Sequence, residues 1–114
     1  MLSPDAVRLR HMREAAATAL EMAGGHVRED LSANTMLAMA LTRCLEILGE
    51  AASRISPEVC ARFPAIPFTK MISMRNRLIH AYFDVNLDIV WTTVKEDLPA
   101  LLPALDEALV AVDR

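Results

Sequence analysis

The chain contains only two cysteines, Cys44 and Cys60, and they form no CxxC motif. This spacing argues against a disulfide framework and against a zinc site, so both thiols are expected to be small hydrophobic side chains in a reduced cytoplasm. The longest uncharged run that resembles a membrane segment covers residues 31–42, whereas a spanning helix needs about 20 residues. Asp5 comes early and no apolar stretch follows Met1. We therefore expect neither a membrane segment nor a secretory signal.

Acidic residues are absent from residues 59–83, a window that carries four basic side chains: Arg62, Lys70, Arg75 and Arg77. The window has charge +4 while the chain has net charge −3, so the remainder carries −7. An acidic protein is not a general binder of nucleic-acid backbones. A local positive patch predicts instead a confined phosphate-binding site. His11 and His26 have no neighbours at metal-ligand spacing, so no metal or other cofactor is expected.

The length of 114 residues is that of one domain, which we expect to cover residues 1–114. Apolar residues make up 54% of the chain, above the roughly 45–50% of ordinary soluble domains. This excess predicts that a second subunit covers part of the apolar surface, because exposed apolar patches usually mark interfaces. We therefore expect a homodimer, with assembly beyond the dimer left open.

Hydrophobic periodicity predicts an all-α fold, an antiparallel bundle of four or five helices with short loops. Capping residues and prolines delimit the helices, and residues 26–34 are expected to be a loop or a ragged helix extension. Pro64 and Pro67 predict a rigid extended connector, and Pro99 and Pro103 should start or kink the last helix. The expected helices cover residues 3–23, 34–54, 56–62, 67–82 and 86 onward.

The second long helix holds three features of interest. Gly49 interrupts good helix formers, which is sensible if another helix must approach closely. Glu46 and Glu50 are four residues apart and share a face, and such a pair is more often a solvated face than a proton-transfer or metal site. The methionines of this helix and of the next are expected to fill the core.

The segment Arg75-Asn76-Arg77-Leu78-Ile79-His80-Ala81-Tyr82 concentrates the chemistry of the chain. Continuous helix through this segment would place Asn76 and His80 on one face, with Arg75 and Tyr82 nearly eclipsed on another. Arginine matches phosphate with a fixed fork of donors, and histidine exchanges protons near neutral pH. This combination suits metal-independent cleavage of RNA, and a second copy across a two-fold axis would complete a cleft.

The same residues carry a family resemblance that spans most of the chain. The motifs are Leu48-Gly49-Glu50-Ala51-Ala52, Pro64-Ala65-Ile66-Pro67-Phe68, the 75–82 segment followed by Val85-Asn86, and Val90-Trp91 followed by Asp97-Leu98-Pro99. In these motifs the chain resembles the HEPN superfamily of small helical ribonucleases, in particular the HepT toxin of HepT–MntA toxin–antitoxin pairs. Two departures are Phe68, where the family often has Trp, and Asn86, where it often has Asp.

The resemblance implies roles for four residues. Arg75 and His80 would be the catalytic pair of a homodimeric ribonuclease, and Asn76 would support the site. Tyr82 matches the tyrosine that a partner, a minimal nucleotidyltransferase, modifies with AMP to silence the toxin. The alternative is a non-catalytic HEPN-type helical module that binds nucleotides or proteins, since some members do not cleave RNA. Whether His80 acts as general base or general acid, and which RNA is cut, stay open.

Overall fold

The computed structural model describes residues 3–114, and every regular element in this range is helical. The first helix, α1, spans Pro4–Ala23, and the Ser3 hydroxyl accepts a hydrogen bond from the Ala6 N–H at 3.1 Å. It ends before Gly24, and Gly25 adopts a positive φ of 79° that side-chain-bearing residues avoid. Both ends lie where the cap and the glycine pair predict them.

The segment predicted as a loop or a ragged extension of the first helix contains a separate short helix, α2 (Arg28–Ala33). Asp30 accepts a hydrogen bond from the Val27 N–H at 3.0 Å and so caps the N-terminus of α2. The sequence pattern does not indicate this cap, because Val27 is not a typical N-cap residue. This hydrogen bond, together with His26 at 2.9 Å, holds the pKa of Asp30 below its ordinary value. Arg28 contacts Asp88 at 2.6 Å, so a residue far along the chain helps to hold α2.

The central helix α3 spans Thr35–Ser53, capped by the Asn34 side chain, which accepts from the Leu37 N–H at 3.0 Å. The stripe predicted for its buried side is buried throughout. Cys44 belongs to this stripe, and burial raises the pKa of its thiol. The methionine prediction is wrong for α3: Met36 and Met39 are 83% and 68% exposed.

A short helix and a turn connect α3 to the next long helix. The short helix, α4 (Pro57–Arg62), is capped by Ser56, whose N–H and hydroxyl both donate to Asp5 of α1. The predicted extended connector is a turn instead, because the Ile66 N–H donates to the Phe63 carbonyl at 3.0 Å. Pro64 occupies the second position of this turn, where its fixed φ is favourable. Proline therefore rigidifies the connection, but as a bend.

The remaining helices are α5 (Phe68–His80), α6 (Leu87–Thr92) and α7 (Leu98–Ala111). A π-helical segment, η1 (Thr93–Asp97), joins α6 to α7 without a break, and the Leu98 N–H donates to the Thr93 carbonyl. Pro99 follows directly, and its missing N–H is accommodated by this local change of register. Of the two prolines predicted to start or kink the last helix, Pro99 lies in the first turn of α7, which continues from η1 without a break, and Pro103 lies inside α7.

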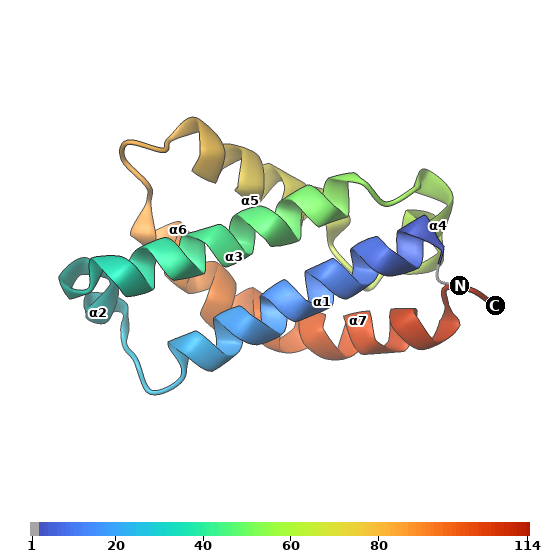
Figure 1. The fold of residues 1–114 in the computed structure, drawn as a ribbon, viewed down its shortest axis with the longest axis horizontal. Coiled ribbons are helices and arrows are strands. Elements are labelled where there is room, and N and C mark those ends of the chain that lie inside the picture. Colours follow the sequence, from blue (N-terminus) through green and yellow to red (C-terminus); the bar gives the residue numbers. More distant parts are fainter. Residues whose placement is uncertain (1–2) are drawn as a thin grey trace.

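The four long helices pack as an antiparallel bundle in the order α7, α1, α3, α5, which confirms the predicted fold class (Figure 1). Leu9, Met12, Leu41, Leu45 and Met71 are fully buried at their contacts. The start of α1 and the end of α7 lie at the same end of the bundle. In the described part of the chain, no helix combines the length and apolarity that crossing a bilayer requires.

Candidate functional site

The site is organised by the crossing of α5 over α3 at Gly49. A Cβ atom built on Gly49 would lie 2.2 Å from the Arg75 Cβ and 2.8 Å from the Met71 carbonyl oxygen. Only a glycine allows the two helix backbones to approach this closely, as the sequence suggested. The crossing therefore fixes where the Arg75 side chain leaves its helix.

Arg75 is held in a half-buried position against α3. Its side chain is 17% exposed, and its terminal nitrogen lies 3.5 Å from the Glu50 Oε2 atom. Its Nε is buried and has no hydrogen-bond partner within the described residues. Buried donors are ordinarily satisfied, so this guanidinium has one donor that the described residues leave unpaired.

Glu50 is shared between two arginines. Its Oε1 atom accepts from Arg54 at 3.0 Å, while Oε2 faces Arg75. The Glu50 side chain is 49% exposed, so water screens both ion pairs. Sequence spacing shows that Glu50 and Arg54 are four apart on α3, but gives no sign that Arg75 joins them.

His80 is the last residue of α5 and is exposed. From ideal helix geometry it lies about 140° around the axis from Arg75 and about 7.5 Å further along it. Arg75 packs against α3 while His80 lies at the C-terminal end of α5, so the chain by itself does not enclose the two side chains in one pocket. Asn76 is half-buried and shares the helix face of His80, as its spacing predicts.

Tyr82 does not lie on the helix. Helix α5 ends at His80, and the Asp84 N–H closes a turn on the Ala81 carbonyl at 2.9 Å, so the predicted eclipsing of Tyr82 with Arg75 is wrong. The chain turns here because Val85 and the residues after it return to pack against the core. Tyr82 is 82% exposed. It lines a groove of about 470 Å³ together with Met39 and other side chains of α3.

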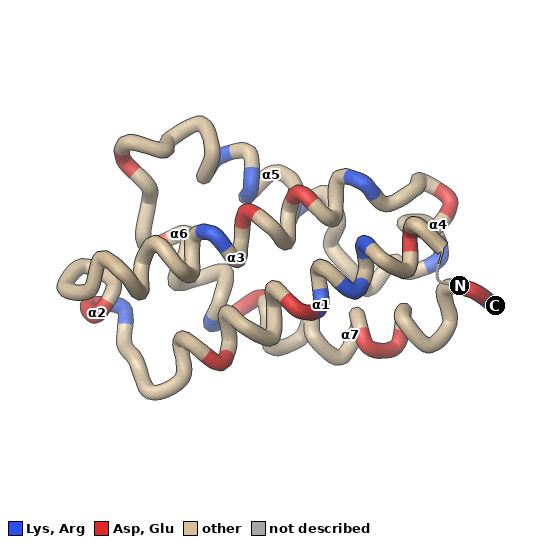
Figure 2. Tube along the Cα trace, viewed as in Figure 1, with Lys and Arg blue, Asp and Glu red and all other residues tan. Residues whose placement is uncertain are grey.

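The positive window of residues 59–83 does not form one patch. Arg62 donates to the Ala111 and Val112 carbonyls at 2.8 and 2.7 Å and so caps α7, while Lys70 pairs with Asp97 at 2.9 Å. Both charges serve the fold, so the predicted cluster of four is wrong for these two members. Basic positions are instead spread over α1, α3 and α5 (Figure 2).

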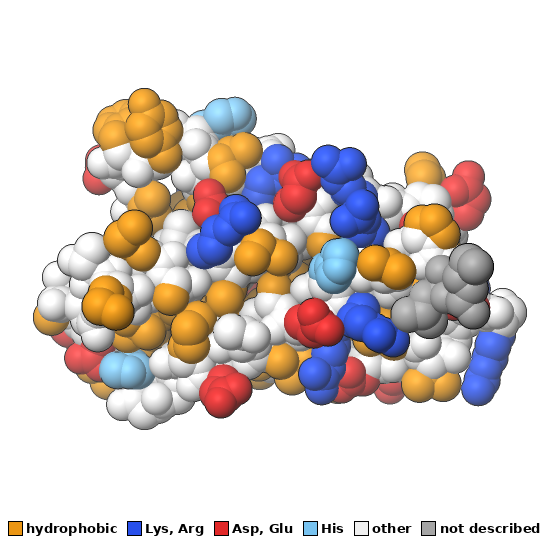
Figure 3. All heavy atoms as spheres, in the orientation of Figure 1, with side chains coloured by type: hydrophobic (Ala, Val, Ile, Leu, Met, Phe, Trp, Pro, Cys, Tyr) orange, Lys and Arg blue, Asp and Glu red, His pale blue; other side chains and the backbone are white. Residues whose placement is uncertain are grey.

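Basic side chains gather on the face where α1, α3 and α5 run side by side (Figure 3). Sequence reasoning missed the contributions of Arg8 from α1 and of Arg43 and Arg54 from α3, which line hollows beside Glu50. Their spacing on two separate helices carries no signal of proximity. Within residues 3–114, no group of three or more His, Cys, Asp or Glu side chains is placed to hold a metal ion.

Comparison with known proteins supplies the context for this site. A family model described as Ribonuclease HepT-like matches residues 12–108. The protein named Probable ribonuclease HepT of Thermococcus cleftensis is 44% identical over 73 residues, which cover 64% of this chain and 66% of that relative. The match thus spans just under two thirds of that relative's length.

Two further relatives carry names of candidate RNases. The protein of Caldanaerobacter subterraneus subsp. tengcongensis is 33% identical over 101 residues, 89% of this chain and 90% of its own length. A protein of Methanocaldococcus jannaschii is 33% identical over 85 residues, 75% of this chain and 70% of its own length. No solved structure matches the chain.

Proposed function

Because the chain belongs to the HepT-like ribonuclease family, we propose that it is a cytoplasmic endoribonuclease whose catalytic pair is Arg75 and His80. The proposal places this activity in one domain formed by residues 1–114 and makes the protein the toxin of a toxin–antitoxin pair. The observation that carries the proposal is the position of Arg75, which is half-buried at the Gly49 crossing and has one unpaired donor among the described residues. The same helix ends in an exposed His80.

The proposed chemistry uses the ribose 2′-hydroxyl of the substrate. The 2′-oxygen attacks the adjacent phosphorus, and the bond from phosphorus to the 5′-oxygen breaks. His80 takes the proton of the 2′-hydroxyl or gives one to the leaving 5′-oxygen. Arg75 stabilises the charge that builds on the phosphoryl oxygens, and Asn76 is the polar neighbour that supports the pair. Water exchanges the other of these two protons, so in this scheme no metal ion is needed.

The direct test is cleavage of single-stranded RNA by the purified protein in excess EDTA. We expect RNA to be cut and a DNA strand of the same sequence to stay intact, because DNA lacks the attacking hydroxyl. Cleavage of both strands at equal rates would contradict the mechanism.

We also propose that the protein is a homodimer. Exposed apolar side chains surround the open end of α5: Ile79 precedes His80, Phe83 lies in the following turn, and Met39 faces the same groove from α3. A second copy seated on this apolar face would bury these side chains and bring two His80 side chains close together. The dimer would then complete a cleft that one protomer leaves open.

A substitution in the proposed dimer interface should weaken self-association. A lysine at Met39 should weaken self-association, because a charge would be placed in the apolar face. Sedimentation equilibrium should show a dimer for the natural protein and a shift toward monomer for Met39→Lys, with slower RNA cleavage per chain. Val110→Lys is the matched control, since Val110 is equally apolar and 65% exposed, but belongs to α7. A natural protein that sediments as a monomer at micromolar concentration would contradict this proposal.

Tyr82 is proposed as the residue through which a partner nucleotidyltransferase silences the toxin. Its phenol is exposed beside the end of α5, where a transferase can reach it. Each AMP group adds negative charge and bulk next to His80, where an RNA phosphate should bind.

Incubation with that transferase and ATP should therefore increase the mass of the protein by whole multiples of an AMP group and abolish RNA cleavage. Tyr82→Phe should gain no mass and should remain an active ribonuclease in the presence of the transferase. Modification of Tyr82→Phe to the same extent as the natural protein would assign the switch to another residue. Intact-protein mass spectrometry and the RNA assay, run on the same samples, decide between these results.

A further inference from the structure

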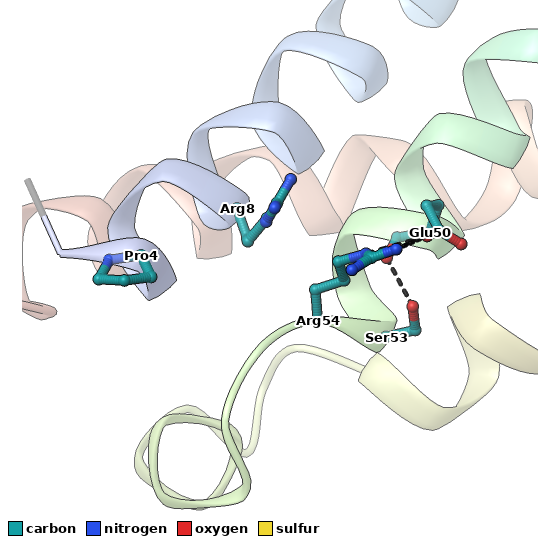
Figure 4. A pocket seen from close by; sticks show the side chains of 5 residues that line it. All are labelled: Pro4, Arg8, Glu50, Ser53 and Arg54. Atoms are coloured by element: carbon teal, nitrogen blue, oxygen red, sulfur yellow. Dashed lines mark hydrogen bonds and ion pairs between the residues drawn. The ribbon is translucent and has the colours of Figure 1, made fainter.

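Two adjoining hollows run between α1 and α3. One of about 410 Å³ is lined by Pro4, Arg8, Glu50, Ser53 and Arg54, and Figure 4 shows Arg8 and Arg54 reaching into it from the two helices. The other, of about 190 Å³, is lined by Arg8, His11, Arg43, Ile47, Glu50 and Ala51. Arg8 and Glu50 border both hollows, which therefore lie side by side and are together called the α1–α3 groove.

The groove is cationic within an acidic protein. Three arginines and one glutamate line it, an excess of two positive charges, although the whole chain has net charge −3. Arg8 forms no ion pair among the described residues, and Arg43 has only a long contact of 4.0 Å with Glu46. Unpaired guanidinium groups facing a shared groove are suited to phosphate, whose oxygens match their fork of donors.

Glu50 is the single carboxylate lining this groove. It lies between Arg54, at 3.0 Å, and Arg75, at 3.5 Å. The longer contact leaves Arg75 incompletely bound, and the buried Nε of Arg75 has no acceptor in the described structure. A phosphate entering the groove would meet the Arg54 guanidinium at the place where the Glu50 carboxylate now neutralises it, while Arg75, which does not line the groove, contacts the other oxygen of the same carboxylate.

We propose that the α1–α3 groove is a second phosphate subsite, which holds the RNA backbone beside the phosphate being cleaved. In this arrangement Glu50 is the internal counterion of the free protein, and the incoming phosphate takes over its contact with Arg54, which leaves Arg75 to the phosphate being cleaved. The inference rests on the proposed function only in taking RNA as the substrate. It adds Arg8 and Arg54 as residues that bind substrate without acting on the reacting atoms.

The test is binding of a fluorescent single-stranded RNA whose 2′-hydroxyls are methylated, so that it cannot be cleaved. Arg8→Ala and Arg54→Ala should each weaken binding about tenfold, as expected for loss of a charge-assisted contact. Each should also reduce the salt dependence of binding by about 0.7 logarithmic units per decade, the value for one phosphate contact on a single strand. In cleavage assays with unmodified RNA, both variants should raise KM and leave kcat unchanged.

The Glu50→Gln variant should act in the opposite direction and bind the methylated RNA more tightly, because the competing negative charge is gone. Arg10→Ala is the matched control: Arg10 is an exposed arginine of the same helix, and its spacing from Arg8 turns it about 200° around the axis, away from the groove. Its affinity and salt dependence should equal those of the natural protein. Arg8→Lys, which retains the charge, should recover most of the lost affinity.

Two results would overturn the subsite. One is that Arg8→Ala and Arg54→Ala, with unchanged helix content and melting temperature, bind the RNA like Arg10→Ala. The other is that an acidic peptide of equal charge competes as well as the RNA, which would show that the groove does not select phosphate. If these variants still cleave RNA in the first case, the proposed ribonuclease activity stands although the subsite does not. Groove-dependent binding without any cleavage would instead uphold the subsite and contradict the ribonuclease.

Discussion

His80→Ala should lose nearly all RNA cleavage in EDTA. General acid–base catalysis by a positioned side chain contributes about 10²- to 10⁴-fold, and His80 is the only imidazole at the end of α5. The loss should appear in kcat, because His80 is proposed to act on the reacting atoms and not to bind the RNA backbone. His80 is exposed, so its removal should change the free energy of unfolding by less than about 0.5 kcal/mol. Circular dichroism and a fluorogenic RNA substrate measure the two quantities on one sample.

The matched control is His26→Ala. This histidine contacts Asp30 beside α2, remote in sequence from α5, and its removal should leave kcat unchanged. Arg75→Lys adds a second comparison, because it retains the charge but loses the planar fork, and it should still reduce kcat. Cleavage by His80→Ala at the natural rate would rule out the proposed mechanism.

Gly49→Ala should be the most damaging small substitution in the chain. The new methyl group would lie 2.2 Å from the Arg75 Cβ, so α3 and α5 must move apart. Overpacking of this kind costs about 1–3 kcal/mol of unfolding free energy, or a melting temperature lower by about 4–8 °C per kcal/mol for a small domain. The same movement displaces Arg75 from Glu50, so RNA cleavage should also fall in the fraction of protein that remains folded.

Gly24→Ala is the control for glycine replacement as such. Gly24 has a φ of −58°, which alanine adopts readily, and its added methyl group would meet the carbonyl oxygens of Glu21 at 3.3 Å and Leu20 at 3.8 Å. We expect a much smaller change in thermal unfolding and none in activity. If Gly49→Ala has the same melting temperature as Gly24→Ala and cleaves RNA at the natural rate, the close crossing does not position Arg75.

Most of the fold was predictable because its signals are local. Ser3, Asn34, Ser56 and Asn86 cap the helices that follow them in the structure, and each acts within three residues of its position. The burial stripe of α3 follows from helical periodicity alone. The close approach at Gly49 was predictable in kind, since a glycine inside good helix formers indicates contact with a neighbour. The identity of that neighbour, Arg75, was not.

The errors occur where distant residues decide the conformation. Tyr82 left the predicted helix because Val85 and Leu87 return to pack against the core. The segment expected to be a loop or a ragged extension of α1 is the separate helix α2, held in part by Arg28 and Asp88, which are sixty residues apart. Local propensity contains no information on contacts of this range, so it extended α5 too far and overlooked α2.

Local signals were sufficient to predict the antiparallel helical bundle, the family, and the helix that carries Arg75, Asn76 and His80, because spacing and capping act over a few residues. Which charges are available became clear from the packing of the helices. This packing assigned Arg62 and Lys70 to structural contacts, and it brought Arg8 of α1 beside Arg54 and Glu50 of α3. The physical reason is that electrostatic interaction depends on distance in space, and helix packing sets that distance between residues far apart in the chain.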